Sequence, residues 1–164
     1  MIAEAVIDSS PDEMLALYRQ RVRGTSIDGI TLLSTDYFNL FNEVIMLLGL
    51  VPDLVEEVEA WRFKTYVEHF ADSGLGFAHL AIEAYDHTPP ESRAEFERIV
   101  GLMRMLVEDI QIALRADLDT GNEAAAMAKA AECAEELKHL IGVGSAVANG
   151  RNASLDQSAI DRLF

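Results

Sequence analysis

The sequence predicts an all-α fold: an antiparallel helical bundle with short helical insertions and a C-terminal amphipathic tail helix. Capping signals that start helices recur along the chain, apolar residues recur at spacings of three and four, and no stretch alternates as a strand does. The chain has 164 residues, 50% of them hydrophobic, which is enough apolar material for one core. We expect the bundle over residues 1–149 and a linker with a short helix over 150–164.

A capping pattern marks the start of four expected helices. It consists of a Ser or Thr with a Glu or Gln three residues later, the arrangement of a capping box. The capping residues are Ser10, Thr65, Thr88 and Ser154. A proline follows Ser10 and Thr88 directly, and proline is favoured at the first helical position. Helices are therefore expected to begin near residues 11, 66, 89 and 155.

The spacing of apolar residues supplies the other helices of the bundle. We expect helices over about 11–22, 31–50, 52–62, 66–72, 76–87, 89–117 and 122–147. Turn-forming residues interrupt the pattern at 28–29, 73–74, 119–122 and 150–152. The alanine-rich run at 124–134 has mostly small side chains, so this part of the helix can pack closely either inside the bundle or across a homodimer interface. The sequence leaves both arrangements open.

The charge of the chain excludes two classes of partner. Its 13 Lys and Arg against 28 Asp and Glu give a formal net charge of −15, and such a surface repels phosphate backbones and anionic lipid. We expect neither a nucleic acid nor a membrane partner.

The apolar stretch 30–51 contains Asp36 and Glu43, so we interpret it as a buried helix rather than a membrane span. A lone Cys133 and the absence of a signal-peptide pattern favour a cytoplasmic protein.

The expected helix over 31–50 carries a narrow polar stripe on an otherwise apolar surface. The stripe covers an arc of about 120°, and its members are Thr35, Asp36, Asn39, Asn42, Glu43 and Met46. One explanation is that the stripe is the solvent face. The other is catalytic, because Asp36 and Asn39 are three residues apart and lie side by side. An acid that pairs with a cation and an amide that orients water suit hydrolysis of a phosphoryl group.

Metal and nucleophile patterns are incomplete in this chain. A di-iron bundle needs two Glu-x-x-His motifs, and only Glu136 with His139 forms one. His79 and His87 share a helix stripe with Glu83, but the two histidines lie about 12 Å apart along the axis. No glycine-rich phosphate loop or nucleophilic triad is present in the sequence. We therefore expect no metal or other cofactor, and a metal-binding bundle is kept as an alternative.

The stretch Glu136 to Gly150, "ELKHLIGVGSAVANG", resembles the helix motif of histidine phosphotransfer domains, in which a lysine and a small glycine-containing turn follow an exposed histidine. Here Lys138 precedes His139, and Ile141 occupies the place of the family's lysine. The resemblance implies phosphotransfer through His139 as an alternative function. The structural explanation is a histidine favoured near a helix C-terminus by the helix dipole.

The segment "LDQSAIDRLF" predicts a separable amphipathic helix. Its apolar face comprises Leu155, Ala159, Ile160, Leu163 and Phe164. A helix this short has marginal stability in isolation. We therefore expect it to order when its apolar face binds in a groove. The groove belongs either to its own bundle or to another protein.

The same segment resembles the short peptide with which flagellar switch proteins capture the phosphorylated chemotaxis response regulator, and a related peptide of CheZ-type chemotaxis phosphatases. The residues that match in order and spacing are Gln157, Ile160, Asp161 and Leu163, and Phe164 stands for the family's last leucine. Ala159 replaces the family's glutamate. The resemblance implies that Leu155 and these residues bind the receiver domain of a response regulator.

Together these observations predict a cytoplasmic bacterial signalling adaptor that docks a CheY-type receiver through its tail. Receiver dephosphorylation by Asp36 and Asn39 is an added expectation, which leaves open whether the chain is an enzyme. It lacks the Asp-x-x-x-Gln signature of CheZ-type enzymes, since Leu40 stands four residues after Asp36.

Overall fold

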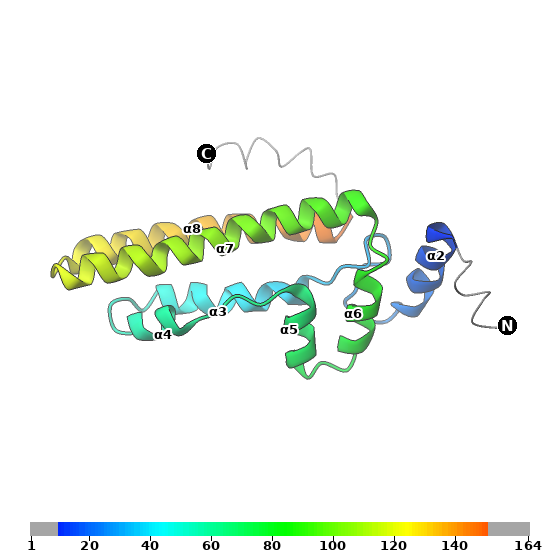
Figure 1. The fold of residues 1–164 in the computed structure, drawn as a ribbon, viewed down its shortest axis with the longest axis horizontal. Coiled ribbons are helices and arrows are strands. Elements are labelled where there is room, and N and C mark those ends of the chain that lie inside the picture. Colours follow the sequence, from blue (N-terminus) through cyan, green and yellow to red (C-terminus); the bar gives the residue numbers. More distant parts are fainter. Residues whose placement is uncertain (1–9, 151–164) are drawn as a thin grey trace.

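The computed structural model describes residues 10–150, and these form an all-α helical bundle (Figure 1). The described elements are α2 (Pro11–Arg21), η1 (Thr35–Phe38), α3 (Asn39–Leu48), α4 (Val55–Ala60), α5 (Tyr66–Ser73), α6 (Ala78–Tyr85), α7 (Pro90–Asp119) and α8 (Glu123–Ala148). Within this range the only β pairing is an isolated bridge between Ile27 and Ser34. The predicted fold class is confirmed. No helix of the described part has both the length and the apolar character needed to cross a membrane.

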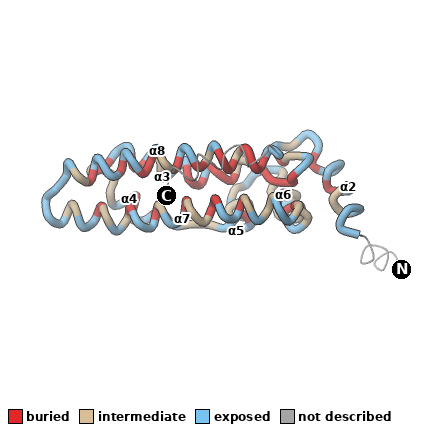
Figure 2. The backbone as a smooth tube through the Cα atoms, turned by 90° about the horizontal axis from the view of Figure 1, so that it is seen from above, coloured by how far each residue is buried: buried red, intermediate tan, exposed pale blue. Residues whose placement is uncertain are grey.

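The long antiparallel pair of α7 and α8 forms one layer of the molecule (Figure 1). Helix α3 runs beside this pair and packs against α8, whereas α4 lies against both α3 and α7. The antiparallel pair α5 and α6 stands across the bundle at the end where α7 begins, and α2 lies beyond it. Buried residues line the facing sides of the long helices (Figure 2). The core is thus shared by all the layers.

Two predicted caps are present, and one is displaced. Ser10 accepts a hydrogen bond from the backbone N–H of Glu13, and Thr65 forms a complete capping box with Glu68. Thr88, however, is buried and its hydroxyl has no hydrogen-bond partner, because α7 starts one residue later, with Pro89 as its N-cap. A residue that precedes a proline is driven to extended backbone, so Pro89 before Pro90 cannot begin the helix.

The expected helix over 31–50 is wrong in its first turn. The side chain of Asp28 accepts hydrogen bonds from the N–H groups of Ile30 and Thr31, and Leu32 has a left-handed φ of 64°. Residues 28–33 therefore form a turn, and helical structure starts after Ser34, whose hydroxyl accepts from the N–H of Asp36. The predicted helix 52–62 is likewise shorter, because the backbone is extended from Trp61.

The polar stripe of α3 faces outward. Asn39, Asn42, Glu43 and Met46 are exposed, whereas Leu40, Phe41, Val44, Leu47 and Leu48 are buried. The alanine-rich part of α8 buries Ala126, Ala130 and Ala134 within the single chain. Because these side chains are small, α8 can approach α7 closely. This alanine face of α8 therefore packs inside the bundle.

Cys133 lies on the buried side of α8, and burial raises the pKa of its thiol to about 12. Since the thiolate is the reactive species, we expect iodoacetamide to alkylate the folded chain at pH 8 more than about a hundredfold slower than the chain unfolded in urea. Timed alkylation followed by mass spectrometry measures both rates. Equal rates would contradict the burial of this side chain.

Candidate functional site

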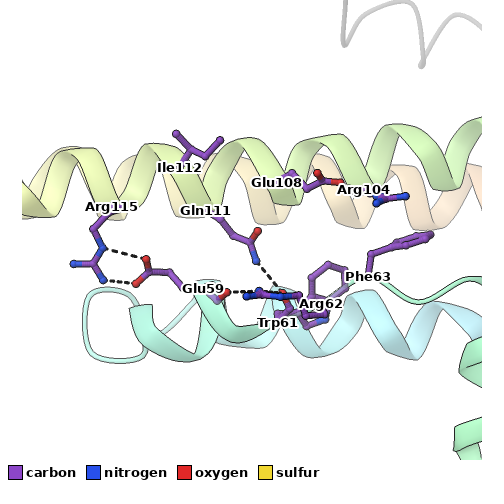
Figure 3. Close-up of a pocket in the computed structure, with 9 residues that line it drawn as sticks. All are labelled: Glu59, Trp61, Arg62, Phe63, Arg104, Glu108, Gln111, Ile112 and Arg115. Carbon is purple, nitrogen blue, oxygen red and sulfur yellow. Dashed lines mark hydrogen bonds and ion pairs between the residues drawn. The ribbon is translucent and has the colours of Figure 1, made fainter.

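A groove runs along α7, between this helix and the segment that follows α4 (Figure 3). It consists of two adjacent cavities, of about 690 and about 200 Å³, which share Phe63 and Arg104 in their linings. The larger cavity extends along α7 to Arg115, and the smaller one extends back to Glu97 and Phe96. We call the two cavities together the α7 groove.

The floor of the groove is the extended segment 61–65, which three side chains hold in place. The Trp61 indole N–H donates to the carbonyl of Leu40 at 3.1 Å. The Gln111 amide reaches down from α7 and donates to the carbonyls of Val58 and Trp61 at 2.9 and 3.0 Å (Figure 3). The Tyr37 hydroxyl donates to the carbonyl of Lys64 at 2.7 Å. These bonds anchor the segment to α3, α7 and η1, and two of them satisfy its own carbonyls, at Trp61 and Lys64.

The larger cavity is cationic, although the chain as a whole is strongly acidic. Arg104 lies 4.6 Å from the centre of the Phe63 ring and donates to Glu108 at 2.7 Å. Arg115 donates twice to Glu59, once at 3.0 Å, and these hydrogen bonds lower the pKa of that carboxyl. Arg62 donates to backbone carbonyls only and has no carboxylate partner within residues 10–150. Three arginines against two glutamates leave this cavity with a positive excess.

The smaller cavity is walled by aromatic rings. Tyr66 stacks on Tyr85 at a centroid distance of 4.4 Å, and Tyr37 and Phe96 pack beside them at 5.5 to 5.9 Å. Burial raises the pKa of all three tyrosines, so their hydroxyls stay neutral. Gly101 opens this wall, since a Cβ there would meet nothing within 4 Å. The cavity offers space for one large apolar side chain.

The predicted catalytic residues lie elsewhere, and their side chains serve different neighbours. Asp36 accepts hydrogen bonds from the hydroxyls of Ser26 at 2.5 Å and Ser34 at 3.4 Å. Asn39 is exposed, accepts from Asn42 at 3.4 Å, and lines a separate cavity of about 250 Å³ that also contains His69, Lys64, Glu43 and Asp72. The carboxylate of Asp36 therefore stabilises the turn before η1. Dephosphorylation by the pair stays a prediction.

His69 lines this second cavity together with Asn39, although no sequence pattern groups the two residues. Burial lowers the pKa of its imidazole, and a hydrogen bond to the backbone of Asp36 opposes that shift. Its ring lies edge-on to Tyr37 at 5.5 Å. Lys64 and Asp72 pair at 3.2 Å across the same cavity. Lys64 and Asp72 are therefore engaged with each other in this cavity.

The histidines considered for the alternative functions have the following places. His139 is exposed on α8, so phosphotransfer through it stays a prediction. His87 stacks on Tyr18 at 4.6 Å, and Glu83 pairs with Arg21 at 3.2 Å. These contacts attach α6 and the turn that follows it to α2. No group of three or more His, Cys, Asp and Glu that could hold a metal ion occurs within residues 10–150.

The six predicted partner-binding residues lie outside the described residues. They are Leu155, Gln157, Ile160, Asp161, Leu163 and Phe164. The last described residue, Gly150, has a left-handed φ of 75° and lies close to Ile30. The segment 151–164 is thus attached at the end of α8, next to the start of α7 (Figure 1).

No sequence pattern predicts the α7 groove, because its walls come from segments about fifty residues apart. The one local signal is "WRFK" at 61–64, an aromatic and basic run in an acidic chain. Comparison with known protein families, curated proteins and solved structures finds no match.

Proposed function

We propose that this chain is a signalling adaptor that docks a CheY-type receiver domain of a response regulator through residues 155–164. The observation that carries the proposal is the order and spacing of Gln157, Ile160, Asp161 and Leu163, which match the receiver-binding peptide. An amphipathic helix with apolar anchors on one face suits docking into a groove of a partner.

The architecture of the bundle supports a carrier role. Its core extends from Tyr18 to Ala148, and the described helices bury one another's apolar faces. Helix α8 ends at Asn149 and Gly150, so the docking segment is attached at an end of the body rather than within a packed face. A tethered segment keeps a bound receiver at high effective concentration near the bundle.

Docking without catalysis is the function that the contacts of Asp36 favour. A carboxylate that accepts hydrogen bonds from Ser26 and Ser34 would have to release them to pair with a receiver cation. Asn39 is exposed, but Asp36, the acid predicted to act with it, is engaged by these two hydroxyls. The proposal is therefore limited to receiver binding.

Ile160→Asp is expected to weaken receiver binding by more than about tenfold, because burying one isoleucine side chain contributes about 1.5–3 kcal/mol. The matched control is Ser158→Asp, which adds the same charge on the polar side of the segment and should change the affinity by less than about twofold. Calorimetric titration with beryllofluoride-activated receiver domains of the chain's own host measures both affinities. Equal losses for the two variants, or no binding by the unchanged chain, would contradict the proposal.

A further inference from the structure

We propose that the α7 groove is the docking site for residues 155–164 of the same chain. This inference goes beyond the proposed function, because it gives the receiver-binding segment a second place to bind.

The length of the groove accommodates the segment. From Glu97 to Arg115 the groove follows about 27 Å of the α7 axis. The ten residues 155–164 span about 15 Å as a helix. The segment is therefore short enough to lie along α7 within the groove and to place side chains in its cavities.

The charges of the two surfaces are complementary. Residues 155–164 carry Asp156 and Asp161 against Arg162, and the chain as a whole has a formal charge of −15, so most of its surface repels the two aspartates. The larger cavity is an exception, with three arginines against two glutamates. Arg62 is exposed, and its guanidinium donates only to the carbonyls of Glu59 and Trp61. It can therefore pair with Asp156 or Asp161 of the segment without breaking an existing ion pair.

The smaller cavity complements the apolar face of the segment. Its walls include the stacked rings of Tyr66 and Tyr85 and the side of Phe63. Because the chain enters at the Glu97 end, Leu155 or Ile160 supplies the apolar side chain that this space accepts, and Leu163 and Phe164 lie further along α7, over the larger cavity.

The segment can reach the groove from its attachment point. Gly144 lies beside Ile99, since a Cβ at Gly144 would come within 3.4 Å of the Ile99 side chain. The end of α8 therefore lies level with the first turns of α7 (Figure 1), and the first groove residues on α7, Phe96 and Glu97, follow in its second turn. Residues 151–154 span up to about 14 Å when extended, and a helix is about 10 Å across.

Docking in the groove would regulate the proposed function, and this consequence depends on that proposal. The apolar face of residues 155–164 cannot contact the groove and a receiver at once. The apparent affinity for the receiver is then the intrinsic affinity multiplied by the fraction of chains whose segment is free. A variant that weakens the groove should bind the receiver more tightly.

Energy transfer from Trp61 tests docking in the full-length chain. Trp61 is the only tryptophan and lines the groove. A dansyl group on Ser158→Cys provides the acceptor, and Cys133 is too buried to compete for the label. We expect transfer in the native chain and a decrease of about threefold in Arg62→Glu. Arg23→Glu, an exposed arginine next to α2, is the matched control and should leave transfer unchanged.

A charge exchange sharpens the test. Asp161→Arg combined with Arg62→Glu should restore the transfer that Arg62→Glu loses, because a direct pair couples the two substitutions. Each labelled chain is compared with its unlabelled counterpart, which removes direct effects on Trp61 emission, and its melting temperature is recorded. Absence of transfer in the native chain, or equal transfer in both arginine variants, would overturn the proposal. Transfer that disappears on dilution would place the segment in a second copy and would also overturn it.

Receiver titration of the same variants separates the two proposals. If the segment docks in the groove and also binds a receiver, Arg62→Glu should bind the receiver about threefold more tightly than Arg23→Glu. Transfer without receiver binding would contradict only the adaptor function. Receiver binding without transfer would contradict only docking in the groove.

Discussion

Trp61→Ala is expected to lower the free energy of unfolding by about 3–5 kcal/mol, the cost of deleting a large buried aromatic side chain. The indole is 7% exposed, packs on Phe41 at a ring distance of 5.6 Å and donates to the carbonyl of Leu40. Its loss leaves a cavity between α3 and the extended segment and removes one of the bonds that hold the groove floor. Urea unfolding followed by circular dichroism measures the change.

Ile112→Ala is the control for this substitution. Ile112 also lines the groove but is 72% exposed, and it projects away from the floor (Figure 3). Its truncation should change the free energy of unfolding by less than about 0.5 kcal/mol. A loss below about 1 kcal/mol for Trp61→Ala would mean that the indole is not packed as described.

Gly144→Ala is expected to destabilise the chain by about 1–3 kcal/mol, because it overpacks the core. A Cβ at this position would lie 2.6 Å from Cζ of Phe38 and 3.2 Å from its Cε1. The Phe38 ring is itself buried and held between Tyr37 and Phe96 at ring distances of 5.9 and 5.6 Å. It cannot move aside without disturbing the aromatic core, so α8 and η1 have to separate. Thermal and urea unfolding measure the loss.

Gly142→Ala on the same helix is the matched control with the opposite sign. Gly142 is exposed and a Cβ there would meet nothing within 4 Å. Alanine is favoured over glycine in a helix interior by about 0.5–1 kcal/mol, so this variant should be more stable than the unchanged chain. Equal effects of the two substitutions would contradict the close approach of Gly144 to Phe38.

Most helices could be predicted from the sequence, because their signals are local. The capping residues Ser10 and Thr65 and the apolar spacing of α7 and α8 place those helices within a few residues of their observed bounds. The errors are also physical. The turn that contains Leu32 replaces a helical start, since Asp28 provides acceptors for its backbone, and Pro90 moves the start of α7 past Thr88.

The candidate sites were less predictable, because each depends on residues distant in the sequence. Asp36 looked free on a helix face, and only the folded chain places Ser26 within hydrogen-bond distance of it. Arg62 and Phe63 become groove residues only when Gln111 of α7 bonds the carbonyl of Trp61. The receiver docking proposed for residues 155–164 is the opposite case, since that proposal is based on the order of the residues alone.

The sequence alone determined the all-α class, the helices and the acidic surface, because caps, apolar periods and charges act within a few residues of one another. The tertiary structure decided which faces meet. The close approach at Gly144, the extended path of 61–65 and the arginines gathered along α7 arise from contacts between segments far apart in the chain. Such contacts depend on the packing of whole side chains against each other, and no local pattern encodes that packing.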